Sequence, residues 1–168
     1  MSVAKSRVPR KARLSQERLA ALAAEGKDDY RAYLTAQIML AQATAEAVGL
    51  TSADFFGLNI VGLRGQVTAG ELATATGLTS GAATRMIDRL EAAGFVRRAH
   101  DTTDRRRVLI ELAPRRQDEI DAVLEPGRRR IAEVFRNFNE EQVRVLFEYF
   151  RHATPAMLAV AADLQRRR

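Results

Sequence analysis

The sequence contains no cysteine among its 168 residues. Disulfides, thiolate metal sites and cysteine-based redox switches are therefore excluded. Histidine is nearly as scarce, with His100 and His152 as the only examples. These two residues do not have the spacing of a ligand set, and a zinc site needs three or four ligands. We therefore expect no metal site.

The sequence also lacks the motifs of common enzyme classes. It has neither a glycine-rich phosphate loop nor a nucleophile elbow. Glu148 and His152 are four residues apart, which places both on one face of a helix, but solvated helix polarity is the simpler explanation of this pair. We expect no catalytic residue, no cofactor and no enzymatic activity.

Long apolar runs are missing as well. No stretch is long enough to span a bilayer, and the basic N-terminus lacks the apolar segment of a signal peptide. The sequence therefore predicts no membrane partner and a protein that stays in the cytoplasm.

The composition is that of a small basic globular protein. With 46% hydrophobic residues the chain can bury one modest core, and its formal charge of +6 favours a polyanionic partner. Residues 1–14 are predicted to be a disordered basic arm, for which a solvated tail is favoured over phosphate contacts. Residues 15–168 are predicted to form a single domain.

Residues 68–112 have the pattern of a helix-turn-helix followed by a hairpin. Thr68 and Glu71 have the spacing of a capping box, and Gly77 is suited to end this first short helix. Thr79 is the next N-cap candidate, for a helix to about Ala93. One face of that helix is apolar and the other polar, with Ser80, Thr84, Arg85, Asp88 and Arg89. Such a helix suits a DNA groove, although an ordinary surface helix has the same pattern.

The helical spacing of the apolar residues ends at Gly94. Residues 95–98 and 107–111 are two short β-prone runs, separated by a basic loop that contains Asp104 and Arg106. An aspartate two residues before an arginine can hold the guanidinium extended for the minor groove. The alternative is a solvated charged loop. The preceding helix pair favours a DNA-contacting wing.

The phrases GELATATGLTSGAATRMIDRLEAAGFVRR and DTTDRRRVLIEL resemble the winged helix-turn-helix of the MarR family of bacterial transcriptional regulators. The chain departs from the family at Asp101-Thr102, where Asp-Pro is usual, and at Ala83, where valine is common. The resemblance implies that residues 79–89 enter the major groove and that Asp104 and Arg106 form a pair in the wing. The expected DNA contacts are Thr79, Ser80, Thr84, Arg85, Arg89, Asp104, Arg105 and Arg106.

The fold class expected is mainly α with a small β-hairpin wing, flanked by terminal dimerisation helices at 28–48 and 115–165. The terminal helices carry more apolar surface than a lone winged helix needs, and relatives in the family are dimers. Pro126-Gly127 interrupts the helical pattern, and Pro155 suggests a further bend. We expect a homodimer on double-stranded DNA, at a pseudo-palindromic site.

The resemblance further implies a small effector between the dimer helices and the winged domain. An arginine beside tyrosines suits an anionic aromatic compound, although Phe55 also fits the core and Arg31 a solvated surface. The expected function is a repressor that this effector releases, and the alternative is a constitutive or architectural DNA-binding protein. The ligand candidates are Tyr30, Arg31, Tyr33, Gln37, Phe55, Phe56 and Asn59.

Overall fold

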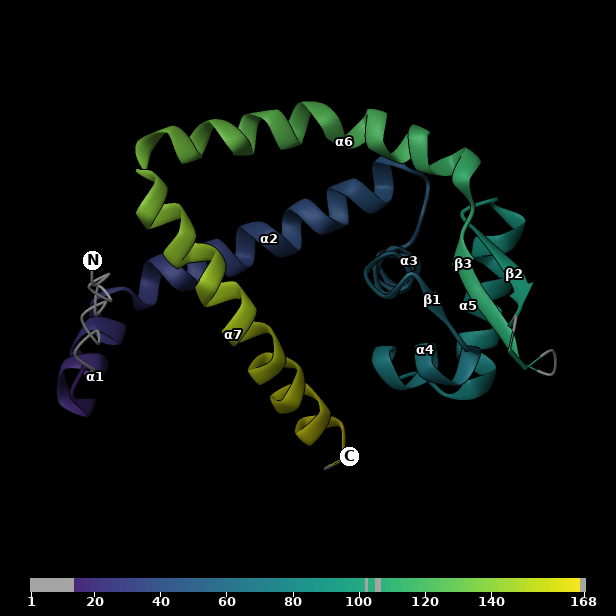
Figure 1. Cartoon of the computed structure of the whole chain (residues 1–168), viewed down its shortest axis with the longest axis horizontal. Helices are drawn as coiled ribbons and strands as arrows, with labels where there is room; N and C mark the ends of the chain where they lie inside the picture. Colours follow the sequence, from purple (N-terminus) through teal and green to yellow (C-terminus); the bar gives the residue numbers. More distant parts are fainter. Residues whose placement is uncertain (1–13, 102, 105–106, 167–168) are drawn as a thin grey trace, which may run out of the picture. The chain divides into compact units, whose positions relative to one another are not determined.

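The computed structural model describes residues 14–101, 103, 104 and 107–166. These residues fall into two units, of which the first ends at Ala41 and the second begins at Gln42. Figure 1 shows the elements in chain order. They comprise seven α-helices, one short 3-10 helix and three strands within the described residues. The prediction of a single domain over 15–168 stays a prediction.

The first unit consists of α1 (Gln16–Glu25) and most of α2 (Lys27–Ala47). The Ser15 hydroxyl accepts a hydrogen bond from the Arg18 amide at 3.2 Å and so caps α1, and Gly26 ends it. No residue of α1 is buried. Large apolar side chains of α2 are also exposed, with Ile38 at 69% and Met39 at 66%. The helix predicted at 28–48 is confirmed as α2 to within one residue at each end.

The second unit contains the winged helix-turn-helix. Its helices are α3 (Ser52–Arg64), α4 (Ala69–Thr76) and α5 (Ser80–Ala92), and its strands are β1 (Gln66–Val67), β2 (Val96–His100) and β3 (Val108–Leu112). The sheet is antiparallel with the order β1-β3-β2. The hairpin β2–β3 was expected. Strand β1 was not, because two residues are too few to show an alternating pattern.

Local sequence signals set the ends of α4 and α5 as predicted. The Thr68 hydroxyl accepts from the Glu71 amide at 3.2 Å, while the Glu71 carboxylate accepts from the Thr68 amide at 2.7 Å, which completes the capping box. Gly77 takes the left-handed conformation (φ 69°) that ends α4. Thr79 then caps α5 by accepting from the Ala82 amide at 3.3 Å. The turn between the two helices is therefore determined locally.

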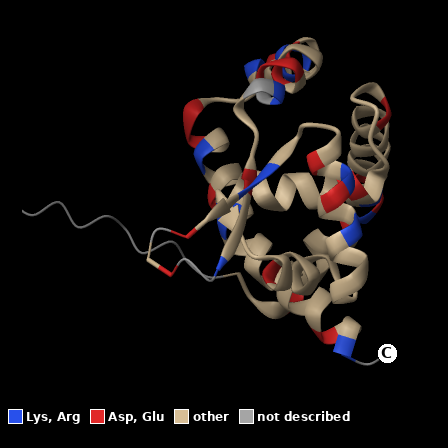
Figure 2. Cartoon of the chain, turned by 90° about the vertical axis from the view of Figure 1, so that its right-hand side faces the viewer, with Lys and Arg blue, Asp and Glu red and all other residues tan. Residues whose placement is uncertain are grey.

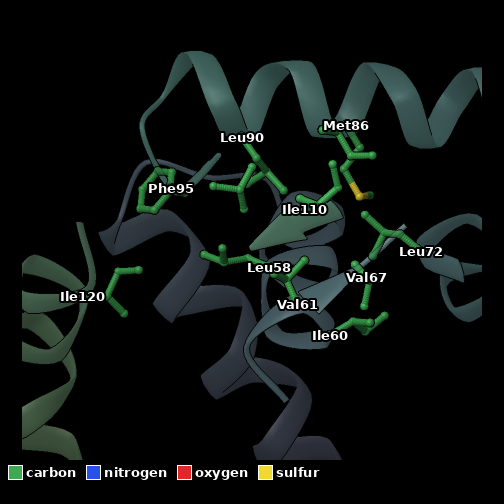
Figure 3. Packing of buried hydrophobic residues seen from close by; sticks show 12 residues of the cluster. Leu58, Ile60, Val61, Val67, Leu72, Met86, Leu90, Phe95, Ile110 and Ile120 are labelled. Atoms are coloured by element: carbon green, nitrogen blue, oxygen red, sulfur yellow. The ribbon is translucent and has the colours of Figure 1, made fainter. Parts of the chain in front are cut away.

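A single hydrophobic core joins α3, α4, α5, the sheet and the start of α6. Figure 3 shows the side chains from these elements meeting, with Leu58 and Val61 of α3 opposite Leu90 and Met86 of α5. Ile120 contributes from α6. Burying a large aliphatic side chain contributes about 1.5–3 kcal/mol, so this cluster is what holds the winged unit together.

The helix α6 (Pro114–Val134) is continuous through Pro126. The expected interruption at Pro126-Gly127 is therefore wrong. A proline removes one backbone hydrogen bond of the helix. The remaining hydrogen bonds of the turns on either side keep this 21-residue helix continuous. The 3-10 turn Phe135–Asn137 and helix α7 (Glu140–Arg166) follow, and α7 likewise continues past Pro155. No helix in the described part of the chain is long and apolar enough to cross a membrane.

Helices α3 and α5 approach closely at Gly57. A Cβ atom at this position would overlap Sδ of Met86, whose side chain is itself buried. Gly62 lies on the same helix, but a Cβ there would meet only Leu112 Cδ1 at 3.5 Å, an ordinary contact. The two glycines therefore differ in packing and not in the kind of element they occupy.

We expect Gly57→Ala to be less stable than Gly62→Ala by about 1–3 kcal/mol, the usual cost of overpacking. Both substitutions gain similar helix propensity, so their difference isolates the close approach. Urea unfolding of the two variants and the wild type measures it. Equal free energies of unfolding would contradict the tight contact between α3 and α5.

Candidate nucleic-acid interface

Helix α5 presents a buried face and an exposed face, as the sequence predicted. Ala83, Met86, Ile87 and Leu90 are buried against the core. Thr79, Ser80, Thr84 and Arg85 are exposed. The N-terminal half of α5 thus offers hydroxyls and a cation to solvent, and at the helix N-terminus itself backbone amides favour an anion such as phosphate.

Arg85 and Thr84 have different surroundings on the exposed face. The Thr84 hydroxyl donates to the Ser80 carbonyl at 2.9 Å, so its proton is used within the helix. Arg85 extends back toward Gly81, where a Cβ atom would lie 3.9 Å from Arg85 Nη1. It forms no ion pair with any described residue. Its guanidinium is therefore available at the N-terminal half of α5.

Arg89 has a protein partner on α3. Its Nε and Nη2 donate to the two carboxylate oxygens of Asp54 at 3.0 and 2.6 Å. Asp54 is only 3% exposed. Burial alone would raise the pKa of Asp54, but hydrogen bonds from Arg89 and Thr51 and the charge of Arg89 outweigh it, so the pKa lies below its ordinary 3.8. The same pairing raises the pKa of Arg89. The predicted DNA contact by Arg89 stays a prediction.

Arg98 connects the wing to α5. Its guanidinium donates to Asp88 at 2.6 Å and also contacts Glu91, while its backbone amide donates to Glu91 at 3.2 Å. The hydrogen bond to Asp88 is the main reason that the pKa of Arg98 is raised. Two acids of α5 thus hold the first strand of the hairpin, and these acids reduce the positive charge of the helix.

The wing loop is shaped by Asp101. Its Oδ1 accepts from the amides of Thr103 and Asp104 at 2.7 and 3.4 Å, and the Asp104 carbonyl accepts from the Arg107 amide at 2.9 Å. The Thr103 amide is the main cause of the lowered pKa of Asp101, with help from the Asp104 amide and Arg107. Arg105 and Arg106 lie outside the described residues, so the Asp104–Arg106 pair stays a prediction.

The strands carry a further ion pair and a side-chain hydrogen bond across the sheet. Glu111 of β3 accepts from Gln66 of β1 at 2.6 Å and from Arg97 of β2 at 2.7 Å, and both bonds lower its pKa. Figure 2 shows basic and acidic segments interspersed over the winged unit rather than gathered into one basic face. Net charge is therefore a poor guide to which arginines can meet DNA.

The predicted ligand residues are distributed over both units. Tyr30, Arg31, Tyr33 and Gln37 are exposed on α2 in the first unit, where Gln37 Nε2 donates to the Tyr33 hydroxyl at 2.8 Å. In the second unit, Phe55 is buried (8% exposed), whereas its neighbour Phe56 is 53% exposed and Asn59 is exposed. A pocket shared by these residues stays a prediction.

A small pocket of about 140 Å3 lies elsewhere in the second unit. Arg116 covers it, with its guanidinium 5.2 Å from the Phe95 ring centre and its Nε donating to the Ala93 carbonyl at 3.3 Å. None of the predicted ligand residues lines it. The lining residues are Ala47, Val48, Phe95, Arg116, Glu119, Ile120 and Val123.

Sequence patterns pointed to the surface of α5 but missed the residues that hold it. No contact was predicted for Asp54, and Arg98 was expected only as part of the β-prone run 95–98. Their partners are 35 and 7–10 residues away in the sequence. The one signal for Asp54 in the sequence was an acid at the start of an otherwise largely apolar helix. In the described residues no group of three or more acids or histidines is arranged to hold a metal.

Comparison with known proteins identifies close sequence relatives. The MarR family model matches residues 50–108. The HTH-type transcriptional regulator YcgE of Bacillus subtilis (strain 168), itself uncharacterized, is 34% identical over 128 residues, which cover 76% of this chain and 83% of YcgE. The match extends well beyond the winged helix on its own.

Solved structures give the same fold. A MarR family protein from Bacillus stearothermophilus superposes with a TM-score of 0.61 at 24% identity, covering 86% of this chain and 99% of that one. RV1404 from Mycobacterium tuberculosis superposes with a TM-score of 0.56 at 28% identity, covering 76% and 93%. The fold of this chain is therefore one already seen in solved structures.

The wing loop gives a prediction about pH. The pKa of Asp101 is lowered in the folded loop, so the hydrogen bonds of its carboxylate persist below pH 3.8 and are lost as the pH falls through the lowered pKa. In an NMR titration, the amide signals of Thr103 and Asp104 should shift with a midpoint below 3.8. A midpoint at or above 3.8 would contradict the geometry. Asp101→Asn keeps the acceptor oxygen and should abolish the titration while preserving the loop.

Proposed function

The chain belongs to the MarR family of DNA-binding transcriptional regulators, and we propose that it acts as a homodimeric repressor at a pseudo-palindromic operator. The observation that carries this proposal is the exposed N-terminal half of α5, with Thr79, Ser80 and Arg85 on one side of a helix whose other side is buried. A helix of this kind fits the major groove, where an arginine can donate two hydrogen bonds to guanine.

The wing supports the same mode of binding. Arg98 joins β2 to α5 through Asp88 and Glu91, so the first strand of the hairpin is attached directly to the helix. Asp104 is exposed at the loop, and Arg105 and Arg106 follow it in the sequence. We propose that this loop reaches the minor groove beside the major groove that α5 occupies.

Exposed apolar side chains support the homodimer. On α7, Met157 is 46%, Leu158 63% and Leu164 59% exposed, and on α6 Val134 is 55% exposed. An open apolar hollow of about 690 Å3 lies along the start of α7, lined among others by Phe138, Val145 and Tyr149. Apolar surface of this extent is costly in water, and a second copy of the chain would cover it.

An effector would release the repressor by favouring a different spacing of the two recognition helices. The exposed rings of Tyr30, Tyr33 and Phe56, with Arg31 beside the tyrosines, suit a small aromatic or anionic compound. The alternative function is that of a constitutive or architectural DNA-binding protein, which the basic residues at positions 1–14 favour slightly. On either account the protein works in the cytoplasm, where bacterial DNA lies.

Selection of bound sequences from a random duplex library at physiological salt tests the proposal. A dimeric repressor should enrich an inverted repeat with half-sites about 10–10.5 bp apart, or a multiple of that spacing. It should also bind the repeat at least about a thousandfold more tightly than random DNA. Tight, salt-sensitive binding without enrichment would replace the proposal by the architectural alternative.

Two substitutions on α7 test the dimer. Met157→Glu places a carboxylate on the apolar face, where pairing would bury it, so we expect a monomer and a loss of operator binding. Ala159→Glu introduces the same charge about 200° further round the helix and should remain a dimer. Light scattering behind size exclusion measures both masses. A Met157→Glu variant with the mass of the wild type would argue against an interface on this face.

A further inference from the structure

Arg85 and Arg89 are the two arginines of α5, and they are four residues apart on its exposed side. Of these two, Arg89 is the one with an ion-pair partner among the described residues. Its two donating nitrogens match the two oxygens of Asp54 in a bidentate pair, which is the strongest geometry for an arginine and a carboxylate. A guanidinium held in this way has fewer donors left for a phosphate or a base.

Asp54 is fixed independently of Arg89. It lies in the first turn of α3, where the helix dipole favours a negative charge. Its backbone amide donates to the Thr51 hydroxyl at 3.1 Å, and the Thr51 side chain also hydrogen-bonds its carboxylate. Asp54 is therefore a rigid anchor to which α5 attaches, rather than a mobile acid that follows Arg89.

Moving Arg89 from Asp54 to DNA would be unfavourable. The Asp54 carboxylate would be left buried without its charged partner, and an uncompensated buried charge is strongly destabilising. A new bond to a solvent-exposed phosphate would not offset that destabilisation, since it would be made in a high-dielectric, salt-screened environment. The pair is therefore expected to persist when DNA binds.

The Asp54–Arg89 pair lies close enough to Arg85 on α5 to affect the direction in which Arg85 points. Gly57 and Met86 set how closely α3 and α5 approach, and the buried face of α5 sets which of its sides is exposed. The bidentate pair at Arg89, one turn beyond Arg85, has a fixed direction and adds a restraint on rotation of α5 about its own axis. Rotation of α5 would change the direction in which Arg85 points.

We propose that Asp54 and Arg89 are a positioning pair that orients α5 on α3, and that Arg85 is the specificity-determining arginine of α5. This inference rests on the proposed operator binding by α5. It replaces the expectation that Arg89 itself contacts DNA. Two rival roles for Arg89 are a direct phosphate contact and a purely stabilising ion pair.

The experiment uses the full chain and the operator obtained by selection, with a scrambled duplex of the same composition for comparison. Fluorescence anisotropy gives the affinity of each variant over a range of salt concentrations, at a temperature where circular dichroism shows the variant folded. The variants are Arg85→Ala, Arg89→Ala, Arg89→Lys, Asp54→Asn and the double variant Asp54→Asn/Arg89→Ala. Arg128→Ala is the matched control, because it removes one arginine and one ion pair from α6.

A positioning pair predicts that Arg89→Ala and Asp54→Asn each weaken operator binding about tenfold, with much less effect on the scrambled duplex. The double variant should be no weaker than the weaker single variant, because both substitutions remove the same ion pair. The dependence of log K on log salt should stay unchanged. Arg89→Lys should also be weakened, because an ammonium cannot form the bidentate pair. Arg128→Ala should bind like the wild type.

The rival roles give different results, and each would overturn the proposal. A phosphate contact predicts that Arg89→Ala lowers the salt slope by about one for each phosphate that Arg89 neutralises, and that Arg89→Lys binds nearly as well as the wild type. It also predicts that Asp54→Asn binds as tightly as the wild type or more tightly. A purely stabilising pair predicts lower melting temperatures with unchanged affinity. If Asp54→Asn does not fold, Arg89→Lys, which keeps the charge, decides between these roles.

Failure of operator binding itself would be distinguishable. In that case the wild type would not prefer the selected repeat. If the wild type prefers the repeat and Arg85→Ala leaves that preference unchanged, operator binding stands and the assignment of specificity to Arg85 is wrong. If instead the wild type discriminates and Arg85→Ala reduces discrimination, the proposed function stands. The behaviour of Arg89→Lys and Asp54→Asn then tests the positioning pair alone.

Discussion

The close packing of α5 against α3 and the sheet is the constraint on which the rest of the structure depends. One face of α5 is buried through Met86, Ile87 and Leu90, and Gly57 of α3 leaves the room that Met86 needs. The opposite face is then exposed, because a surface helix that packs one stripe against the core turns its other side to solvent. The DNA-facing residues are presented by the core rather than by any feature of their own.

Ion pairs determine which arginines of the winged unit are available to DNA. The chain is basic overall, but many arginines of the winged unit are already paired with acids. Arg89 meets Asp54, Arg98 meets Asp88 and Glu91, and Arg97 meets Glu111. The pairs of Arg98 and Arg97 lie at the surface, where ion pairs contribute little to stability. The consequence of all these pairs is directional, because they connect α5 to α3 and to the wing and leave Arg85 available for another partner.

The apolar side chains outside the winged unit differ from those of the core in their exposure to solvent. The side chains of the core are covered within the chain, whereas those of α1, α2 and α7 are exposed over much of their length. On α7 the rings of Phe147 and Phe150 pack at 6.1 Å, a local cluster that does not remove the exposed apolar face. This surplus is what makes the assembly of two chains part of the proposed function.

The sequence by itself determined the elements and their ends, since capping residues act over three or four positions. Thr68 with Glu71, Gly77 and Thr79 define the helix-turn-helix without help from the rest of the fold, and the exposed face of α5 follows from a 3.6-residue period. The MarR resemblance was carried by these same residues. Strand β1 was missed because its two residues become a strand only by pairing with β3, and the break expected at Pro126 was wrong because a long helix tolerates the loss of one bond. What only the tertiary structure decided is which charged residues meet. Asp54 and Arg89 are 35 positions apart in the sequence. No local sequence pattern predicts that the buried carboxylate of Asp54 pairs with Arg89, because the two residues come into contact only when α3 and α5 pack in the same core.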